Sequence, residues 1–211
     1  MKKIMFNDKY NLTEAVLSGR KTQTRRLIPQ SVIDKAEQYR VDYFNDTFDS
    51  ISLEIALSEA HTFMPVKCLS KYKVGDKVAV SQSYYDIWRS ECLSYNMANE
   101  MWELINNGNR GMSNKMFVRA ELMPHNIIIE NIRVERLQDI SEKDCISEGV
   151  IEFDDCFGHG FMIEDPNNTN WRRHIYTTAR RAFASLIDKV SGKGTWDRNP
   201  YVFVYDFKLK N

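Results

Sequence analysis

The chemistry of this chain is most concentrated in residues 19–26, which read Gly-Arg-Lys-Thr-Gln-Thr-Arg-Arg. Half of these residues are basic, and two hydroxyls stand among the cations. A lysine beside a hydroxyl can take up its proton and activate it for attack, and arginines can hold an anion or the edge of a base. In an extended chain, alternate residues from Thr22 to Arg26 share one face, and Gln23 and Arg25 share the other. A charged edge strand, protected from aggregation, accounts for the same residue types.

The elements expected around this segment place it between a helix and a strand end. Asn11 can cap a short helix over residues 12–18, and Gly19 is suited to end that helix. A strand over residues 21–28 would then end at Pro29, because the residue before a proline is restricted and proline has no N–H to donate. The basic segment is therefore expected to begin where the helix ends.

The rest of the chain mixes short strands and helices in no strict alternation. Strands are expected around Val78 and Val80, over residues 116–122, after Pro124 and over residues 201–209. Helices are expected within residues 89–115, from Ser141 to about Glu148, and from Trp171 to Val190. This order predicts an α+β fold built as a small barrel.

The composition is that of a globular domain. The chain has 211 residues, of which 43% are hydrophobic, and its 29 basic residues balance its 29 acidic residues. A net charge of zero argues against binding to duplex nucleic acid or to an anionic membrane through bulk positive charge. The apolar runs are too short to span a bilayer, and the first residues lack the apolar core of a signal peptide. A cytoplasmic protein without membrane partners is expected.

A zinc site is the metal alternative that the cysteines raise. Cys156 and His159 have the spacing of zinc ligands, and Cys145 and His174 are candidates to complete the set. His159 lies between two glycines with no further ligand nearby in the sequence. The cysteines include no CxxC pair and are most simply free thiols in a reducing compartment. Neither a metal nor an organic cofactor is therefore expected.

Four blocks, in order along the chain, resemble the ASCH superfamily, whose members are relatives of the PUA fold. They are GRKTQTRR at 19–26, YKVGD at 72–76 leading to VAV, VERLQDIS at 134–141 and NPYVF at 199–203. The long form is most similar to ASCH proteins of phages and bacteria. The resemblance implies one domain over 1–211, with a small, mostly antiparallel, PUA-like β-barrel and flanking helices. It also implies insertions at about 30–70, 89–115 and 151–182.

ASCH proteins are expected to handle RNA or modified nucleosides, and one branch hydrolyses the acetyl amide of N(4)-acetylcytidine. The resemblance carries that branch's lysine onto Lys21, its threonine onto Thr24 and its glutamate onto Glu148, with Glu142 as a rival carboxylate. It implies hydrolysis of N(4)-acetylcytidine-like nucleosides without a metal. The alternative is a non-catalytic module that binds nucleotides or single-stranded RNA in the same pocket.

The three residues suit such a reaction chemically. Amide hydrolysis needs a nucleophile, a base and an acid. Thr24 can attack or position a water. Lys21 can act as the base if burial and the neighbouring arginines lower its pKa, and Glu148 can act as the acid if the C-terminal end of its helix raises its pKa. A tight ion pair between Lys21 and Glu148 would oppose both shifts, so the two side chains are expected to stay apart.

Eight further residues are expected to bind the ligand. The arginines suit phosphate, and Gln82 stands where many ASCH proteins have an acidic residue. Its amide can hydrogen-bond a base edge but cannot transfer protons. Aromatic residues just after the central strand can stack on a base, although core packing accounts for at least one of them. The expected set is Arg20, Thr22, Arg25, Arg26, Gln82, Tyr84, Tyr85 and Trp88.

Overall fold

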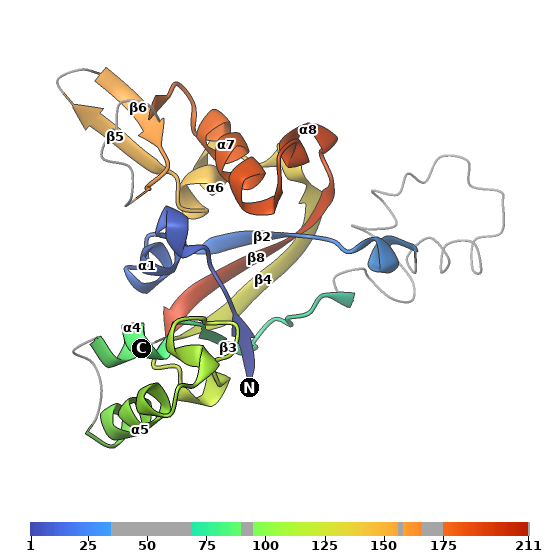
Figure 1. Ribbon diagram of the computed structural model, residues 1–211. Helices are drawn as coiled ribbons and strands as arrows, with labels where there is room; N and C mark the ends of the chain where they lie inside the picture. Colours follow the sequence, from blue (N-terminus) through green and yellow to red (C-terminus); the bar gives the residue numbers. More distant parts are fainter. Residues whose placement is uncertain (35–68, 90–94, 156–157, 166–174, 211) are drawn as a thin grey trace.

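The centre of the protein is a curved five-stranded sheet, seen in a computed structural model that describes residues 1–34, 69–89, 95–155, 158–165 and 175–210 (Figure 1). In sheet order the strands are β1 (Lys2–Ile4), β3 (Lys77–Val80), β4 (Asn126–Arg136), β8 (Tyr201–Lys210) and β2 (Gln23–Leu27). β1 pairs with β3 in parallel, and the other neighbours are antiparallel. The sheet is therefore mixed, and β1 and β2 form its two edges.

The long pairing of β4 with β8 carries the main core. Alternation of large apolar residues in the last strand predicts its buried face, and Phe203, Tyr205 and Phe207 are all buried as expected. Ile132 lies opposite Tyr205 in the register. These side chains pack in one cluster with apolar residues of the helix α7 (Ala179–Ser191), among them Phe183. Burial of this face against a helix is the main force that holds the sheet in place.

Short helices position the two ends of the sheet. α1 (Leu12–Leu17), α6 (Glu142–Ser147), α7 and α8 (Thr195–Arg198) belong to the half of the molecule that surrounds β2 and β8 (Figure 1). α4 (Tyr84–Arg89) and α5 (Tyr95–Asn106) lie at the other end, over β3. They form a second, smaller apolar cluster that includes the fully buried Ala79, Ile87 and Met101. Three 3₁₀ turns belong to the same framework, at Asp8–Tyr10 (η1), Arg110–Met112 (η3) and Leu137–Asp139 (η5).

A separate three-stranded antiparallel sheet occupies part of the segment expected as the third insertion. It consists of β5 (Ile151–Asp155), β6 (Gly158–Met162) and β7 (Ile175–Tyr176). Of the first insertion, 35–68 lie outside the described residues. The second insertion supplies α5 and the turn at η3.

The α+β class is confirmed, and two local predictions are wrong. Residues 116–122 form no strand and end in the 3₁₀ turn η4 (Ala120–Leu122), because the carbonyls of Met116 and Val118 accept hydrogen bonds from Lys3 Nζ and not from a neighbouring strand. Ile175 lies in β7, outside the long helix. Thr178 caps that helix, so it begins only at Ala179.

Closure of the sheet into a barrel is not seen among the described strands, whose order leaves β1 and β2 unpaired with each other. No helix in the described part of the chain is both long enough and apolar enough to cross a membrane.

Candidate functional site

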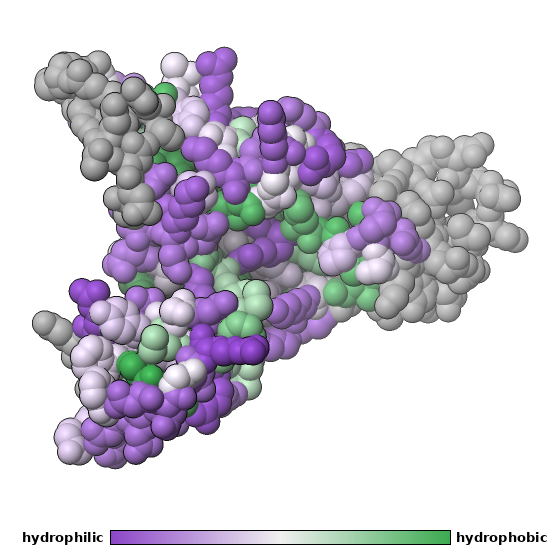
Figure 2. Space-filling view, viewed as in Figure 1, coloured by the Kyte–Doolittle hydropathy of each residue, from purple (hydrophilic) through white to green (hydrophobic). Residues whose placement is uncertain are grey.

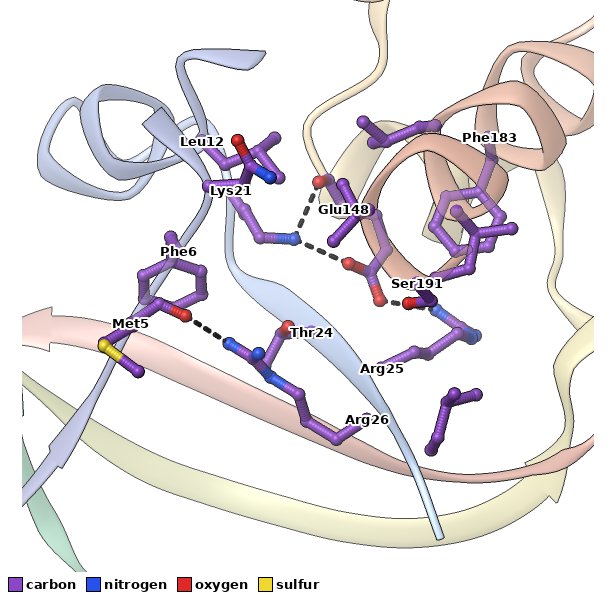
Figure 3. Close-up of a pocket in the computed structure, with 15 residues that line it drawn as sticks. Met5, Phe6, Leu12, Lys21, Thr24, Arg25, Arg26, Glu148, Phe183 and Ser191 are labelled. Atoms are coloured by element: carbon purple, nitrogen blue, oxygen red, sulfur yellow. Dashed lines mark hydrogen bonds and ion pairs between the residues drawn. The ribbon is translucent and has the colours of Figure 1, made fainter. Parts of the chain in front are cut away.

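A cavity of about 270 Å³ opens beside the start of β2. Its walls come from the segment after β1, from α1, from the basic segment, from the end of α6 and from α7 (Figure 3). The polar side chains that line it include Lys21, Thr24, Arg25, Arg26 and Glu148. All three residues expected to be catalytic therefore meet in one cavity, together with two of the expected ligand contacts.

Main-chain hydrogen bonds hold Lys21 and Glu148 side by side. The Lys21 N–H donates to Ala15 of α1 at 2.7 Å, and the next N–H donates to Ser147 of α6 at 3.0 Å. Ser141 caps α6 by accepting from the Asp144 N–H, as its sequence predicts. Glu148 is the C-cap of this helix. The chain turns away at the next residue, Gly149, whose φ of +106° favours glycine.

Lys21 and Glu148 form a buried ion pair. Lys21 Nζ lies 2.6 Å from Glu148 Oε2 and donates to the Glu148 main-chain oxygen at 2.7 Å (Figure 3). Their side chains are 2% and 6% exposed. The expectation that these residues stay apart is wrong. An isolated charge at either position would be desolvated without a partner, which costs far more than pairing.

Burial lowers the pKa of Lys21 below its ordinary value of 10.5. The carboxylate of Glu148 opposes this shift through its charge and its hydrogen bond, whereas the charges of Arg26 and Arg25 add to it. The net direction is downward. Lys21 thus gives up its proton more readily than an ordinary lysine, as a general base must.

Arg25 holds the other oxygen of Glu148. Its Nη1 lies 3.3 Å from Glu148 Oε1, while its Nε and Nη2 donate to Glu135 Oε1 at 3.0 and 2.5 Å. Nη2 also lies 3.2 Å from Asp144 Oδ2, and Nη1 donates to the Gln23 side chain. Burial alone would lower the pKa of Arg25, but the surrounding carboxylates raise it above its ordinary value. The arginine is thus a fixed cation that orients Glu148.

Thr24 and Arg26 extend from the same face of β2, as the alternation predicts. Thr24 pairs with Tyr205 in the register and is buried. Among the described residues, no hydrogen-bond partner of the Thr24 hydroxyl is found, so the hydroxyl is available to a ligand or a water. Arg26 Nη2 donates to the Met5 main-chain oxygen at 2.6 Å, and its guanidinium carbon lies 5.7 Å from the centre of the Phe6 ring (Figure 3).

Arg20 and Thr22, two of the expected ligand contacts, lie outside this cavity. Arg20 Nη2 pairs with Glu164 Oε2 at 2.8 Å. Thr22 is exposed, and neither residue lines the cavity. Arg20 belongs to the turn after α1, where Glu164 holds its side chain. The Thr22 carbonyl accepts from the Phe207 N–H of β8 at 2.9 Å, but the side chain of Thr22 is exposed.

The four expected contacts after β3 lie outside this cavity. The helix that follows β3 packs against α5 in the second apolar cluster, which includes Tyr84 and Ile87. Gln82 is buried, and its N–H lies 3.4 Å from the Met123 sulfur. Tyr84 is fully buried, and its hydroxyl accepts from the Arg119 N–H at 2.9 Å. None of the four lines the cavity.

Tyr85 and Trp88 form an exposed aromatic row with Trp102. Tyr85 is 45% and Trp88 40% exposed, and the ring centres of Trp88 and Trp102 are 5.4 Å apart. This row belongs to α4 and α5. Tyr85 and Trp88 do not line the cavity that holds Lys21, Thr24 and Glu148, so their stacking on a ligand stays a prediction.

The zinc alternative gains no support from the described residues. Cys156 and His174 lie outside them. Cys145 is fully buried, and burial raises the pKa of its thiol to about 12. His159 Nε2 lies 3.5 Å from Glu152 Oε1. Within the described part of the chain, no group of three potential metal-ligating side chains comes together.

Sequence reasoning missed two contributors to the site. The apolar wall comes from the last turns of α7, with Leu186, Ile187 and Val190, which the periodicity assigns simply to the core. Glu135 and Asp144 belong to the network that holds Arg25. Only the pairing of strands and the docking of α6 bring these carboxylates to Arg25, so no local sequence signal reveals them.

Comparison of the chain with protein-family models, with curated proteins and with solved structures gives no match in any of the three.

Proposed function

We propose that this protein hydrolyses the acyl amide on the exocyclic nitrogen of N(4)-acetylcytidine-like nucleosides, with Lys21 as base, Glu148 as acid and Thr24 at the nucleophile. The observation that carries the proposal is the buried Lys21–Glu148 pair at 2.6 Å in a cavity that Thr24 also lines. A lysine with a lowered pKa, a carboxylate and a hydroxyl thus meet at one cavity, and residues with shifted pKa values in a cavity are candidates for catalysis.

The ion pair becomes the reactive form by moving one proton. Transfer from Lys21 Nζ to Glu148 Oε2 along their hydrogen bond gives a neutral amine and a neutral carboxyl, which are the base and the acid that amide hydrolysis requires. The transfer replaces two charged groups with two neutral ones, and loss of water penalises charged groups. A substrate that displaces water from the cavity therefore favours the transfer. The tight pair therefore replaces two independent pKa shifts with one internal proton transfer.

The atoms then balance through one cycle. The Thr24 hydroxyl, or a water that it orients, attacks the acyl carbon and gives its proton to Lys21 Nζ. The bond between the acyl carbon and N4 breaks, and N4 takes the proton of the Glu148 carboxyl. If Thr24 itself attacked, the oxygen of a water then bonds to the acyl carbon, the bond from that carbon to the Thr24 oxygen breaks, and one proton of the water returns to the Thr24 oxygen. The products are cytidine and a carboxylic acid, and the Lys21–Glu148 pair is ionic again.

Kinship with the ASCH superfamily belongs to the same proposal. It is supported by the four sequence blocks and by the approach of the two sheet edges, which the hydrogen bond from Arg26 to Met5 bridges. We propose that the sheet is a PUA-like barrel, with this bridge where its two edges meet. We also propose that the protein is cytoplasmic and acts on nucleosides. The non-catalytic RNA-binding module remains the alternative if turnover is absent.

The test measures the release of cytidine from N(4)-acetylcytidine in the presence of EDTA, with chromatography as the detection method. The wild-type protein should release cytidine, and Lys21→Met should lower the rate by about 10²-fold or more, the usual contribution of a general base. Lys77→Met, which changes an exposed lysine of β3, serves as the matched control. A wild-type rate equal to that of Lys21→Met would reject the hydrolase and leave the binding module.

A further inference from the structure

A second cavity, of about 390 Å³, adjoins the first. Met5, Arg26 and Leu27 line both, so these three residues form the wall between the two cavities. Figure 2 shows a recess at the centre of the corresponding face, where apolar and polar surface meet. The second cavity lies between the two edges of the sheet, where its walls include Ile4 of β1 and Pro29 after β2.

Arg26, at the shared wall, differs from the other two cations of the first cavity in its neighbours among the described residues. Lys21 is paired with Glu148, and Arg25 contacts three carboxylates. For Arg26, by contrast, no carboxylate lies within ion-pair distance in the part of the chain that the structure describes. Its one hydrogen bond among those residues goes to the Met5 carbonyl. The remaining donors of the planar guanidinium suit an anion that offers two oxygens, such as phosphate.

The charges around the second cavity have the same sign. Lys71 lines it, is exposed, and places its ammonium 5.3 Å from the centre of the Tyr72 ring. Lys3 also lines it but directs its ammonium to two main-chain carbonyls. Among the described residues that line this cavity, none is acidic. Arg26 and Lys71 thus offer two cations to an anion at the junction.

The inner wall of the second cavity is aromatic. Phe203, Tyr205 and Tyr72 contribute to it, and the Tyr72 and Tyr205 rings meet edge to face at 5.2 Å. The Tyr72 hydroxyl donates to the Lys3 carbonyl at 2.9 Å, and the Tyr205 hydroxyl bonds Ser70 at 2.7 Å. Both hydroxyls are engaged, and burial raises the pKa of Tyr72 to about 12. The rings therefore present uncharged apolar surface, which suits a nucleobase.

We propose that the protein acts on its modified cytidine within a nucleotide chain. Arg26 and Lys71 bind the phosphodiester, the first cavity holds the target base, and the second cavity holds the neighbouring nucleoside. The identity of the target base rests on the proposed function, whereas the phosphate position and the second cavity rest on the charges and walls described above. The substrate class is thus a single-stranded oligonucleotide in preference to a free nucleoside.

Binding of unmodified product analogues tests this without any hydrolysis. Isothermal titration at low salt compares cytidine, the two cytidine monophosphates and cytidylyl-(3′→5′)-cytidine. The dinucleotide should bind at least about tenfold more tightly than cytidine, as a charge-assisted phosphate contact permits. Its logarithmic salt dependence should have a slope of about −0.7 for each phosphate contact. Arg26→Gln should bring its affinity close to that of cytidine, and Arg26→Lys should restore part of the difference.

Lys71→Gln, an exposed change, gives a second variant should Arg26→Gln fold poorly, and it should weaken dinucleotide binding several-fold. Arg20→Gln is the matched control, because Arg20 pairs with Glu164 outside both cavities. Equal affinities for cytidine and dinucleotide would overturn the phosphate position. Monophosphates that bind as tightly as the dinucleotide would overturn the role of the second cavity. Either result can occur with or without acetylcytidine turnover, so the two proposals fail separately.

Discussion

Replacing Glu148 with Gln removes the carboxylate that neutralises the most deeply buried lysine of the site. Lys21 is 2% exposed at its side chain, and its ammonium hydrogen-bonds only to Glu148 among the described residues. The amide of Gln keeps the size of the side chain and can still accept a hydrogen bond, but it carries no charge. Arg25 retains Glu135 and Asp144, so the loss falls mainly on Lys21.

The size of this loss has an upper limit set by the lysine itself. Breaking a buried ion pair from one side typically costs about 3–5 kcal/mol in the free energy of unfolding. Lys21 can instead become neutral, which at pH 7 costs a group of pKa about 10.4 no more than about 4.6 kcal/mol. We therefore expect Glu148→Gln to destabilise the protein by about 3–4.6 kcal/mol at pH 7. The melting temperature should fall by roughly 6–18 °C.

The pH dependence identifies the cause. If the variant folds with a neutral Lys21, its folding releases a proton, and this becomes easier as the pH rises. The difference in stability between wild type and variant should then shrink by up to about 1.4 kcal/mol for each pH unit above 7. Combining Lys21→Met with Glu148→Gln should remove this dependence, because no lysine remains to lose a proton.

Urea unfolding followed by circular dichroism, at pH 7, 8 and 9, measures these differences. Glu142→Gln is the matched control, since Glu142 is an exposed residue in the first turn of the same helix. A Glu148→Gln protein as stable as wild type, or a loss of stability that is the same at all three pH values, would refute the argument that a buried charge is left unpaired.

Three further outcomes follow from the placement of the site residues. Thr24→Val should abolish cytidine release, and Thr24→Ser should retain part of it, because only Ser keeps the hydroxyl. Trapping of an acyl-enzyme with hydroxylamine in the wild type would show that Thr24 is itself the nucleophile. Arg25→Gln should lower stability, and it should lower the rate of cytidine release by about 10-fold or more, because it removes the cation on Glu148 Oε1 and leaves Glu135 with Arg133 as its ion-pair partner. An unchanged rate in chromatographic assays would deny Arg25 its positioning role. Trp88→Ala should leave the rate of cytidine release unchanged, because the aromatic row lies on α4 and α5, outside the cavity. A rate loss above tenfold would favour the prediction that Trp88 contacts the ligand.

The sequence predicts the local parts of the site and not their assembly. Residue types single out the basic segment, and the resemblance to the ASCH superfamily selects Lys21, Thr24 and Glu148. The capping signal at Ser141 and the glycine after Glu148 indicate where α6 ends. The contact between Lys21 and Glu148 could not be foreseen as a tight pair, because it depends on α6 docking against the residue after Lys21 through a main-chain hydrogen bond.

The expected ligand contacts that do not line the cavity show the same limit of prediction from sequence. Gln82 and the aromatic residues after it follow a strand that was expected to border the pocket. Tyr84 instead belongs to the apolar cluster that includes Met101 of α5, and its hydroxyl accepts from the Arg119 N–H. These contacts are tertiary, so no local pattern in the sequence reveals them. Arg20 differs from Arg26 for a related reason, because only Arg26 belongs to a strand whose side chains face the cavity.

The pH profile of kcat/KM for N(4)-acetylcytidine tests the central claim, that Lys21 and Glu148 share one catalytic proton. The active pair carries one proton, so a second proton inactivates it at low pH and loss of the only proton inactivates it at high pH, which predicts a bell-shaped profile. Since burial lowers the pKa of Lys21, the alkaline midpoint should lie below the ordinary lysine value of 10.5. A flat profile, or an alkaline midpoint at or above 10.5, would contradict the account.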